Sequence, residues 1–261
     1  TTVVDAYLSP ILHHYVDELA VELGDVRLLF MQSNGGLVQA SRFRGKDSVL
    51  SGPAGGVVGA VRTAKMAGFK KIIGFDMGGT STDVSHYAGT FERAFDVNIA
   101  GIRVRAPAMQ INTVAAGGGS LLHFDGSRLR VGPNSAGADP GPAGYGRNGP
   151  LTVTDANIML GRINVKYFPH VLGPNSDEPL NVKIVKDKFS SLAREVGLPA
   201  VEVAEGFIQI AIQNMANAIK QISVQRGYDV TEYALTCFGG AGGQHACGVA
   251  DALGMETIFV H

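Results

Sequence analysis

The stretch 75-FDMGGTSTD-83 follows the apolar run 70-KKIIG-74 and places two carboxylates, two glycines and three hydroxyls in one turn. Gly78 and Gly79 expose backbone N–H groups because neither has a side chain, and phosphate oxygens accept from such donors. A Walker loop requires GxxxxGK[ST] between a strand and a helix, and that string does not occur, so the P-loop class is disfavoured. We predict a phosphate-binding loop between two strands.

The side chains of residues 76–83, called the phosphate loop below, predict a metal as well as phosphates. Asp76 and Asp83 bracket the loop, and Mg²⁺ prefers a few carboxylates while keeping some of its waters. We expect both carboxylates to hold Mg²⁺, directly or through water, and to be the catalytic residues. A tight turn that the Asp and Thr side chains only cap remains the alternative. The expected phosphate ligands are Gly78, Gly79, Thr80, Ser81 and Thr82.

A second glycine cluster, 238-FGGAGG-243, follows the apolar stretch 233-YALTCF-238 and precedes a helical pattern up to Gly254. Strand, glycine turn and helix N-terminus together favour an anion or nucleotide site. Close packing of a strand-to-helix turn is the alternative. His245 is interpreted as a polar cap and not as an acid or base. The expected ligands here are Gly239, Gly240, Ala241, Gly242 and Gly243.

Around these loops, helices and strands alternate in the pattern of an α/β protein. Apolar spacing predicts helices over residues 5–24, 53–68, 184–197 and 203–227, and strands over 26–32, 70–77, 83–89 and 91–97, the last three as a meander. The segment 203–227 has a continuous apolar face. Residues 117–150 are dense in Gly and Pro, which predicts a long irregular loop.

Charge and composition exclude several classes of partner. Lys and Arg number 22 against 23 Asp and Glu, which is far from the basic stripe that nucleic-acid binding needs. Neither a membrane-spanning apolar run nor a secretory signal is present, so we expect a cytoplasmic protein. Cys237 and Cys247 lack CxxC spacing and are interpreted as packing residues. The missing initiator Met indicates a piece of a longer protein.

Seven strings in order along the chain resemble the central ATPase region of the hydantoinase/oxoprolinase family. The two strings at residues 74–85 and 238–246 are most similar to the ATP-hydrolysing 5-oxoprolinase branch. N-methylhydantoinases and acetone carboxylase subunits share less similar forms of these strings. The strings are 31-MQSNGG-36, 51-SGPAGGVVGA-60, 74-GFDMGGTSTDVS-85, 112-NTVAAGGGS-120, 135-SAGADPGPA-143, 152-TVTDAN-157 and 238-FGGAGGQHA-246.

The resemblance implies an actin-like ATPase (ribonuclease-H-like) fold, with mixed sheets flanked by helices in two lobes that clasp a nucleotide. Residues 1–69 would contribute to the first lobe and the crossover, and residues 70–261 would form the second lobe. Residues 76–83 resemble the second phosphate loop of that superfamily, and residues 238–243 resemble its adenosine loop, the name used below. The family carries a further loop of the DxGGT type, whereas this chain contains one copy.

The implied activity is ATP-dependent hydrolysis of a cyclic amide, 5-oxoproline to glutamate, with ATP and Mg²⁺ as cofactors. The implied partners are the remaining segments or a partner subunit of the full enzyme and a second copy of the chain, and we expect the isolated piece to be inactive. An N-methylhydantoinase or an acetone-carboxylase-type subunit is the alternative within the class. A non-catalytic nucleotide-binding module is the alternative of another class, and a sugar or acetate kinase fits the strings less well.

Overall fold

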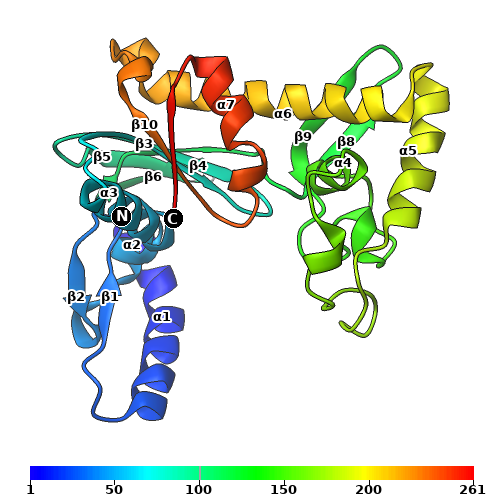
Figure 1. Ribbon diagram of the computed structural model, residues 1–261. Helices are drawn as coiled ribbons and strands as arrows, with labels where there is room; N and C mark the ends of the chain where they lie inside the picture. The colour runs from blue at the N-terminus through cyan, green and yellow to red at the C-terminus, as the bar shows by residue number, and fades with distance from the viewer. Residues whose placement is uncertain (100) are drawn as a thin grey trace. The chain divides into compact units, whose positions relative to one another are not determined.

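The computed structural model describes residues 1–99 and 101–261 and has the mixed α/β composition that the sequence predicts (Figure 1). Most expected helices are present, with ends shifted by a few residues. The helices are α1 (Thr2–Leu23), α2 (Gly45–Ser48), α3 (Ser51–Met66), α4 (Val153–Met159), α5 (Val182–Val196), α6 (Ala200–Ile222) and α7 (Ala246–Leu253).

Eleven strands among the described residues form one five-stranded sheet and three two-stranded sheets. The larger sheet has the order β11-β10-β3-β4-β7, in which β10 and β11 are parallel, and the pairs are β1-β2, β5-β6 and β8-β9. The strands are β1 (Leu29–Met31), β2 (Leu37–Gln39), β3 (Lys71–Met77), β4 (Thr82–Ala88), β5 (Arg93–Ile99), β6 (Ile102–Met109), β7 (Ile111–Val114), β8 (Ser120–Phe124), β9 (Leu129–Ser135), β10 (Ala234–Phe238) and β11 (Thr257–Val260).

The chain divides into two compact units, one of residues 1–74 and 85–111 and the other of residues 75–84 and 112–261. The second unit contains the whole phosphate loop with the ends of β3 and β4 that flank it, and also the adenosine loop. These units are not the two lobes that the resemblance implies. The lobe boundary after residue 69 therefore stays a prediction.

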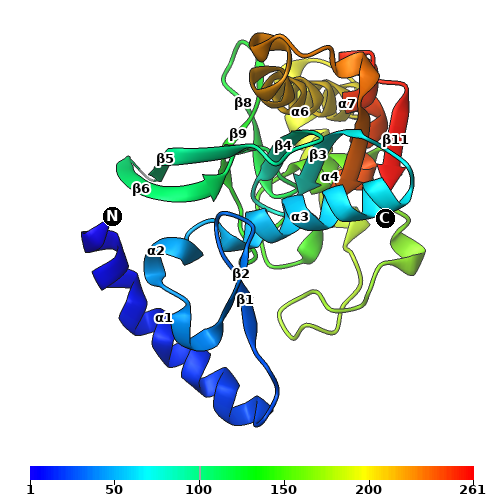
Figure 2. The ribbon, with the colours of Figure 1, turned by 90° about the vertical axis from the view of Figure 1, so that its left-hand side faces the viewer.

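The meander predicted over residues 70–97 is wrong in its last strand. Strand β5 does not extend the sheet of β3 and β4 but pairs antiparallel with β6, in the hairpin seen in Figure 2. The long hairpin partner was missed because the alternation in 102-IRVRAPAM-109 is weakened by Pro107 and two Ala. Helix α1 forms as expected, but Val16 is its one buried residue among those described, so its apolar face is largely exposed.

The core of the second unit is built on α6, as the 3.6-residue pattern predicts. Its apolar face is fully covered, and full burial of a large side chain contributes roughly 1.5–3 kcal/mol. Figure 1 shows α7 along one end of α6 and α4, α5 and β9 along the other. No helix among the described residues is long and apolar enough to cross a membrane. The buried residues predicted from the sequence are Phe207, Ile208, Ala211, Met215, Ile219 and Ile222.

The prediction that residues 117–150 are irregular throughout is wrong, because β8 and β9 form an antiparallel hairpin there. Gly and Pro dominate the composition and hide two short alternating stretches. The turn between the strands is held by Asp125, whose Oδ1 accepts the backbone N–H of Ser127 and of Arg128, both at 3.0 Å. An Asp-Gly turn between two apolar runs is the signal that could have revealed the hairpin.

The segment between β7 and β8 packs its backbone directly on the phosphate loop. The N–H of Gly118 donates to the carbonyl of Gly78 at 3.0 Å, and that of Gly119 donates to Gly79 at 2.5 Å. A methyl group on Gly117 would lie 2.6 Å from the nitrogen of Ser81, which no folded chain allows without a shift. An added Cβ at Gly119 would likewise lie 2.9 Å from the carbonyl oxygen of Gly79, so Gly117 and Gly119 are required by this close approach.

A buried polar pair links α4 to the residue before α7. Asn157 Nδ2 and His245 Nε2 lie 3.0 Å apart, and both residues are almost fully buried. Burial lowers the pKa of His245 to about 4, helped by the positive charge of Arg162. Among the described residues, His245 Nδ1 and Asn157 Oδ1 have no hydrogen-bond partner. His245 is thus a neutral, structural residue at the start of α7.

Replacing Gly117 by Ala should lower the free energy of unfolding by about 1–3 kcal/mol, because the methyl group overlaps the backbone of the phosphate loop. Gly79→Ala is the matched control, since an added Cβ there meets no atom within 4 Å. Chemical denaturation of both variants checks the difference. Equal stability of the two would show that the contact is not tight.

Stability should depend on pH through His245. The unfolded chain takes up a proton on this side chain below its ordinary pKa of 6.5, whereas the folded chain stays neutral down to about 4. The free energy of unfolding therefore falls as the pH falls through this window, by up to about 1.4 kcal/mol per unit. His245→Gln should flatten the slope in denaturation series, and the exposed His170→Asn should not. An unchanged slope in His245→Gln would contradict this.

Candidate functional site

The phosphate loop leaves β3 at Met77 and enters β4 at Thr82, and it is closed by the N–H of Gly78 donating to the carbonyl of Ser81 at 3.0 Å. Gly79 and Thr80 at its tip are exposed. Thr82, also expected to bind phosphate, is fully buried, and its hydroxyl donates to the carbonyl of Ala116 at 2.5 Å. The structure therefore separates a tip open to ligands from a threonine that holds the loop in place.

The two carboxylates of the loop lie near each other. Burial raises the pKa of the half-buried Asp76, and the negative charge of Asp83 raises it further. Asp83 accepts a hydrogen bond from the hydroxyl of Thr113 at 2.6 Å. Among the described residues, no basic side chain contributes to the pKa of Asp76, so none of them offsets the repulsion between the two carboxylates.

A divalent cation would supply the charge that this pair lacks. Among the described residues, no group of three or more His, Cys, Asp or Glu side chains could hold a metal ion by itself. Mg²⁺ in nucleotide sites needs one or two carboxylates and takes its other ligands from phosphates and water. The pair Asp76 and Asp83 fits that requirement.

The adenosine loop lies against the end of β3. The N–H of Ala241 donates to the carbonyl of Met77 at 3.0 Å, and a methyl group on Gly239 would lie 2.5 Å from Oδ1 of Asp76. Gly239 also has a positive φ of 85°, which favours glycine. The structure thus brings together the two loops that the sequence singles out. The last two residues of the loop belong to a short 3₁₀ turn, Gly242–Gln244, that the sequence pattern does not predict.

The glycines of the two loops have different roles. An added Cβ at Gly79, Gly240 or Gly243 would meet no atom within 4 Å, so these positions present open backbone. An added Cβ at Gly242 would lie 2.8 Å from the sulfur of Cys237. Gly239 therefore serves packing of the loop on the end of β3, and Gly242 serves packing on β10. The open glycines are the ones that a ligand can approach.

The two cysteines also differ. Cys237 is fully buried, and burial together with the charge of Asp76 raises its pKa to about 11, so it is a packing residue as predicted. Cys247 is exposed, and its assignment as a packing residue is wrong, because the first turn of α7 directs it to the surface. Among the described residues, neither cysteine belongs to a group of three or more His, Cys, Asp or Glu side chains that could hold a metal ion.

Sequence reasoning assigned no role to Thr113 or to Gly117–Gly119, although it singled out the segment 112–120. No local sequence pattern indicates that a hydroxyl on one strand will orient a carboxylate on another strand. The run of three glycines was the available signal, since consecutive glycines in an ordered segment indicate a close backbone approach.

Comparisons with known proteins show the family of the chain. The family model described as "Hydantoinase/oxoprolinase" matches residues 1–261. The chain is 47% identical to 5-oxoprolinase 1 of Arabidopsis thaliana over 100% of this chain and 22% of that protein. The crystal structure of an ATP-dependent caprolactamase from Pseudomonas jessenii is 36% identical, with a TM-score of 0.84 over 100% of this chain and 38% of that one.

The nucleotide-free structure of an acetone carboxylase is 26% identical, with a TM-score of 0.80 over 94% of this chain and 35% of that one. The chain thus spans about a fifth of the curated relative's length and somewhat more than a third of the solved chains. The family model covers every residue, including both loops of the candidate site. The chain is a member of the hydantoinase/oxoprolinase family.

Proposed function

We propose that this chain is the nucleotide-binding core of an enzyme that hydrolyses a cyclic amide at the expense of ATP, converting 5-oxoproline to glutamate. The observation that carries the proposal is the meeting of the two loops, where Gly239 packs on Asp76 and open glycines lie on both sides. The relatives named 5-oxoprolinase and ATP-dependent caprolactamase support this reaction class.

In this proposal the tip of the phosphate loop holds the β- and γ-phosphates through the backbone N–H of Gly79 and the hydroxyls of Thr80 and Ser81, because the N–H of Gly78 donates within the loop to Ser81. Asp76 and Asp83 organise Mg²⁺, and Thr113 keeps Asp83 in position by its hydrogen bond. The open backbone of Gly240 and Gly243 in the adenosine loop supports the nucleoside. When bound, Mg²⁺ would neutralise negative charge on the phosphates.

The chemistry follows from the stability of an amide. The amide oxygen forms a bond to the γ-phosphorus, the bond from that phosphorus to the β-phosphate oxygen breaks, and ADP leaves with the electron pair. The nitrogen loses its proton, and the product is an O-phosphorylated imidate. One water adds to the imidate carbon and the C–N bond breaks with proton transfer to nitrogen. A second water then hydrolyses the acyl phosphate to carboxylate and phosphate.

The rest of the enzyme is also a proposal. Because the chain spans about a fifth of the curated relative, we infer that further segments or a partner subunit complete the site, including a second phosphate loop. The complete protein would be cytoplasmic, and it would assemble with further copies of itself. The isolated chain would bind nucleotide weakly or not turn it over.

The alternative within the class is a hydantoin-opening enzyme or a carboxylase subunit, which the acetone carboxylase structure favours. The same phosphorylation would then activate a different carbonyl. The alternative of another class is a nucleotide-binding module without chemistry, which the single DxGGT loop favours. Calorimetric binding of Mg·ADP to the chain without any turnover by the complete protein would support that module.

The complete protein should form glutamate from 5-oxoproline with one ADP per glutamate. Asp76→Asn should lower kcat by roughly a hundredfold or more, because the metal loses a ligand at the transferring group. Asp187→Asn, an exposed carboxylate on α5, is the matched control and should keep normal turnover. Glutamate and ADP are measured together, with hydantoins as a parallel substrate.

Normal formation of glutamate and ADP by Asp76→Asn would contradict the assignment of Asp76 as the catalytic carboxylate. ADP release with hydantoins alone would move the protein to the sister activity and leave the nucleotide site intact. If the complete protein formed no ADP with any cyclic amide, the proposed reaction class would be excluded.

A further inference from the structure

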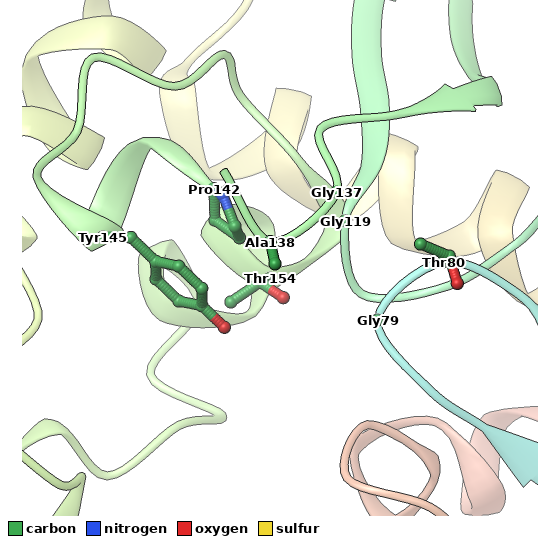
Figure 3. Close-up of a pocket in the computed structure, with 8 residues that line it drawn as sticks. All are labelled: Gly79, Thr80, Gly119, Gly137, Ala138, Pro142, Tyr145 and Thr154. Carbon is green, nitrogen blue, oxygen red and sulfur yellow. The ribbon is translucent and has the colours of Figure 1, made fainter. Parts of the chain in front are cut away.

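A cavity of about 360 Å³ lies within the second unit, beside the tip of the phosphate loop. Gly79 and Thr80 form one wall. The opposite wall comes from the segment after β9 and from α4, with Pro142, Tyr145 and Thr154 (Figure 3). The volume is in the range of roughly 300–1,000 Å³ typical of sites for small molecules.

The wall opposite the phosphate loop is held by one buried carboxylate. Asp155 is fully buried and accepts the N–H of Ala143 at 3.0 Å and of Gly144 at 2.7 Å. It also accepts the N–H and the hydroxyl of Thr152, at 2.8 and 2.9 Å, in the capping box that begins α4. Tyr145 directly follows Gly144, whose N–H donates to this carboxylate. Thr154 lies inside the capping box that this carboxylate closes with Thr152. Both side chains are thus presented by a preorganised frame.

The frame is also tied to the phosphate loop. The N–H of Thr154 donates to the carbonyl of Gly118 at 2.8 Å, and the N–H of Gly118 donates to Gly78 at 3.0 Å. A methyl group on Gly118 would lie 2.8 Å from the Thr154 hydroxyl. The distance between the two walls of the cavity is therefore set by backbone contacts and not by flexible side chains.

The lining is uncharged and combines a few polar groups with a larger share of apolar surface. In Figure 3 the phenol oxygen of Tyr145 and the hydroxyl of Thr154 project toward Gly79 of the phosphate loop. Pro142, Ala138 and the ring of Tyr145 add apolar surface. Burial and the charge of Asp155 raise the pKa of Tyr145, so the phenol keeps its proton and can donate a hydrogen bond. Such a lining suits a small ring that carries a neutral amide.

We propose that this cavity is the acceptor pocket, in which a cyclic amide lies with its ring against Pro142 and Tyr145 and its amide group between the two hydroxyls and the γ-phosphate. The inference rests on the proposed function, because it locates the phosphoryl acceptor of that reaction. Tyr145 donates a hydrogen bond to the amide oxygen of the substrate. The second lone pair of that amide oxygen faces the phosphate loop. Thr154 accepts the amide N–H.

The test measures binding separately from turnover. The complete protein with Mg²⁺ and a non-hydrolysable ATP analogue is titrated calorimetrically with 5-oxoproline and with 2-pyrrolidinone. Tyr145→Phe and Thr154→Val should each weaken binding at least fivefold, and the KM for the cyclic amide should rise by a similar factor. The KM for ATP should stay within twofold, since neither side chain belongs to the phosphate loop.

Tyr167→Phe is the matched control, because Tyr167 is 76% exposed in the same unit and lies outside the cavity. Thermal unfolding of each variant shows that the fold is kept. Unchanged lactam affinity in both cavity variants would overturn the pocket and, if turnover persists, leave the proposed function standing. Weakened lactam binding in both cavity variants, together with a wild-type protein that binds the lactam but opens no ring, would support the pocket while the proposed function fails. Absence of lactam binding by the wild-type protein would overturn the pocket.

Discussion

The site depends on a backbone-to-backbone contact between the phosphate loop and Gly117–Gly119. At Gly118, an added Cβ would lie 2.8 Å from Thr154 Oγ1, 3.5 Å from Ala241 Cβ and 3.9 Å from the carbonyl of Gly78. The phosphate loop, the adenosine loop and the start of α4 therefore meet at a position without a side chain. Because packed interiors do not deform continuously, a shift of one of these segments must move the others.

The carboxylates of this region divide into two kinds by their surroundings. Asp155 is more deeply buried than Asp76, yet four hydrogen bonds from backbone and hydroxyl donors satisfy it, and its role is to hold two segments together. Asp76 is half-buried beside another carboxylate, without donors that offset the repulsion. A partly buried charge without compensation is costly in a purely structural role, and the proposed Mg²⁺ would supply the missing positive charge at the second site.

The glycines of the two loops are present for two different structural reasons. Both loops are glycine-rich, and the sequence does not distinguish a glycine that a ligand approaches from one that a neighbouring strand approaches. The structure makes the distinction, since Gly240 has open space where Gly242 has the sulfur of Cys237. The same holds for the hydroxyls, because Thr80 is exposed while Thr82 is committed to the carbonyl of Ala116.

The sequence by itself determined the local features, namely the apolar face of α6, the strand–loop–strand around residues 76–83 and the presence of two glycine-rich loops. These follow from periodicity and residue type within one segment. Tertiary structure alone decided that β5 pairs with β6, that Thr113 orients Asp83, and that Tyr145 and Thr154 face the phosphate loop. Each of those contacts joins elements through packing and hydrogen bonds that no periodic pattern within one segment encodes, so they exist only once the chain has folded.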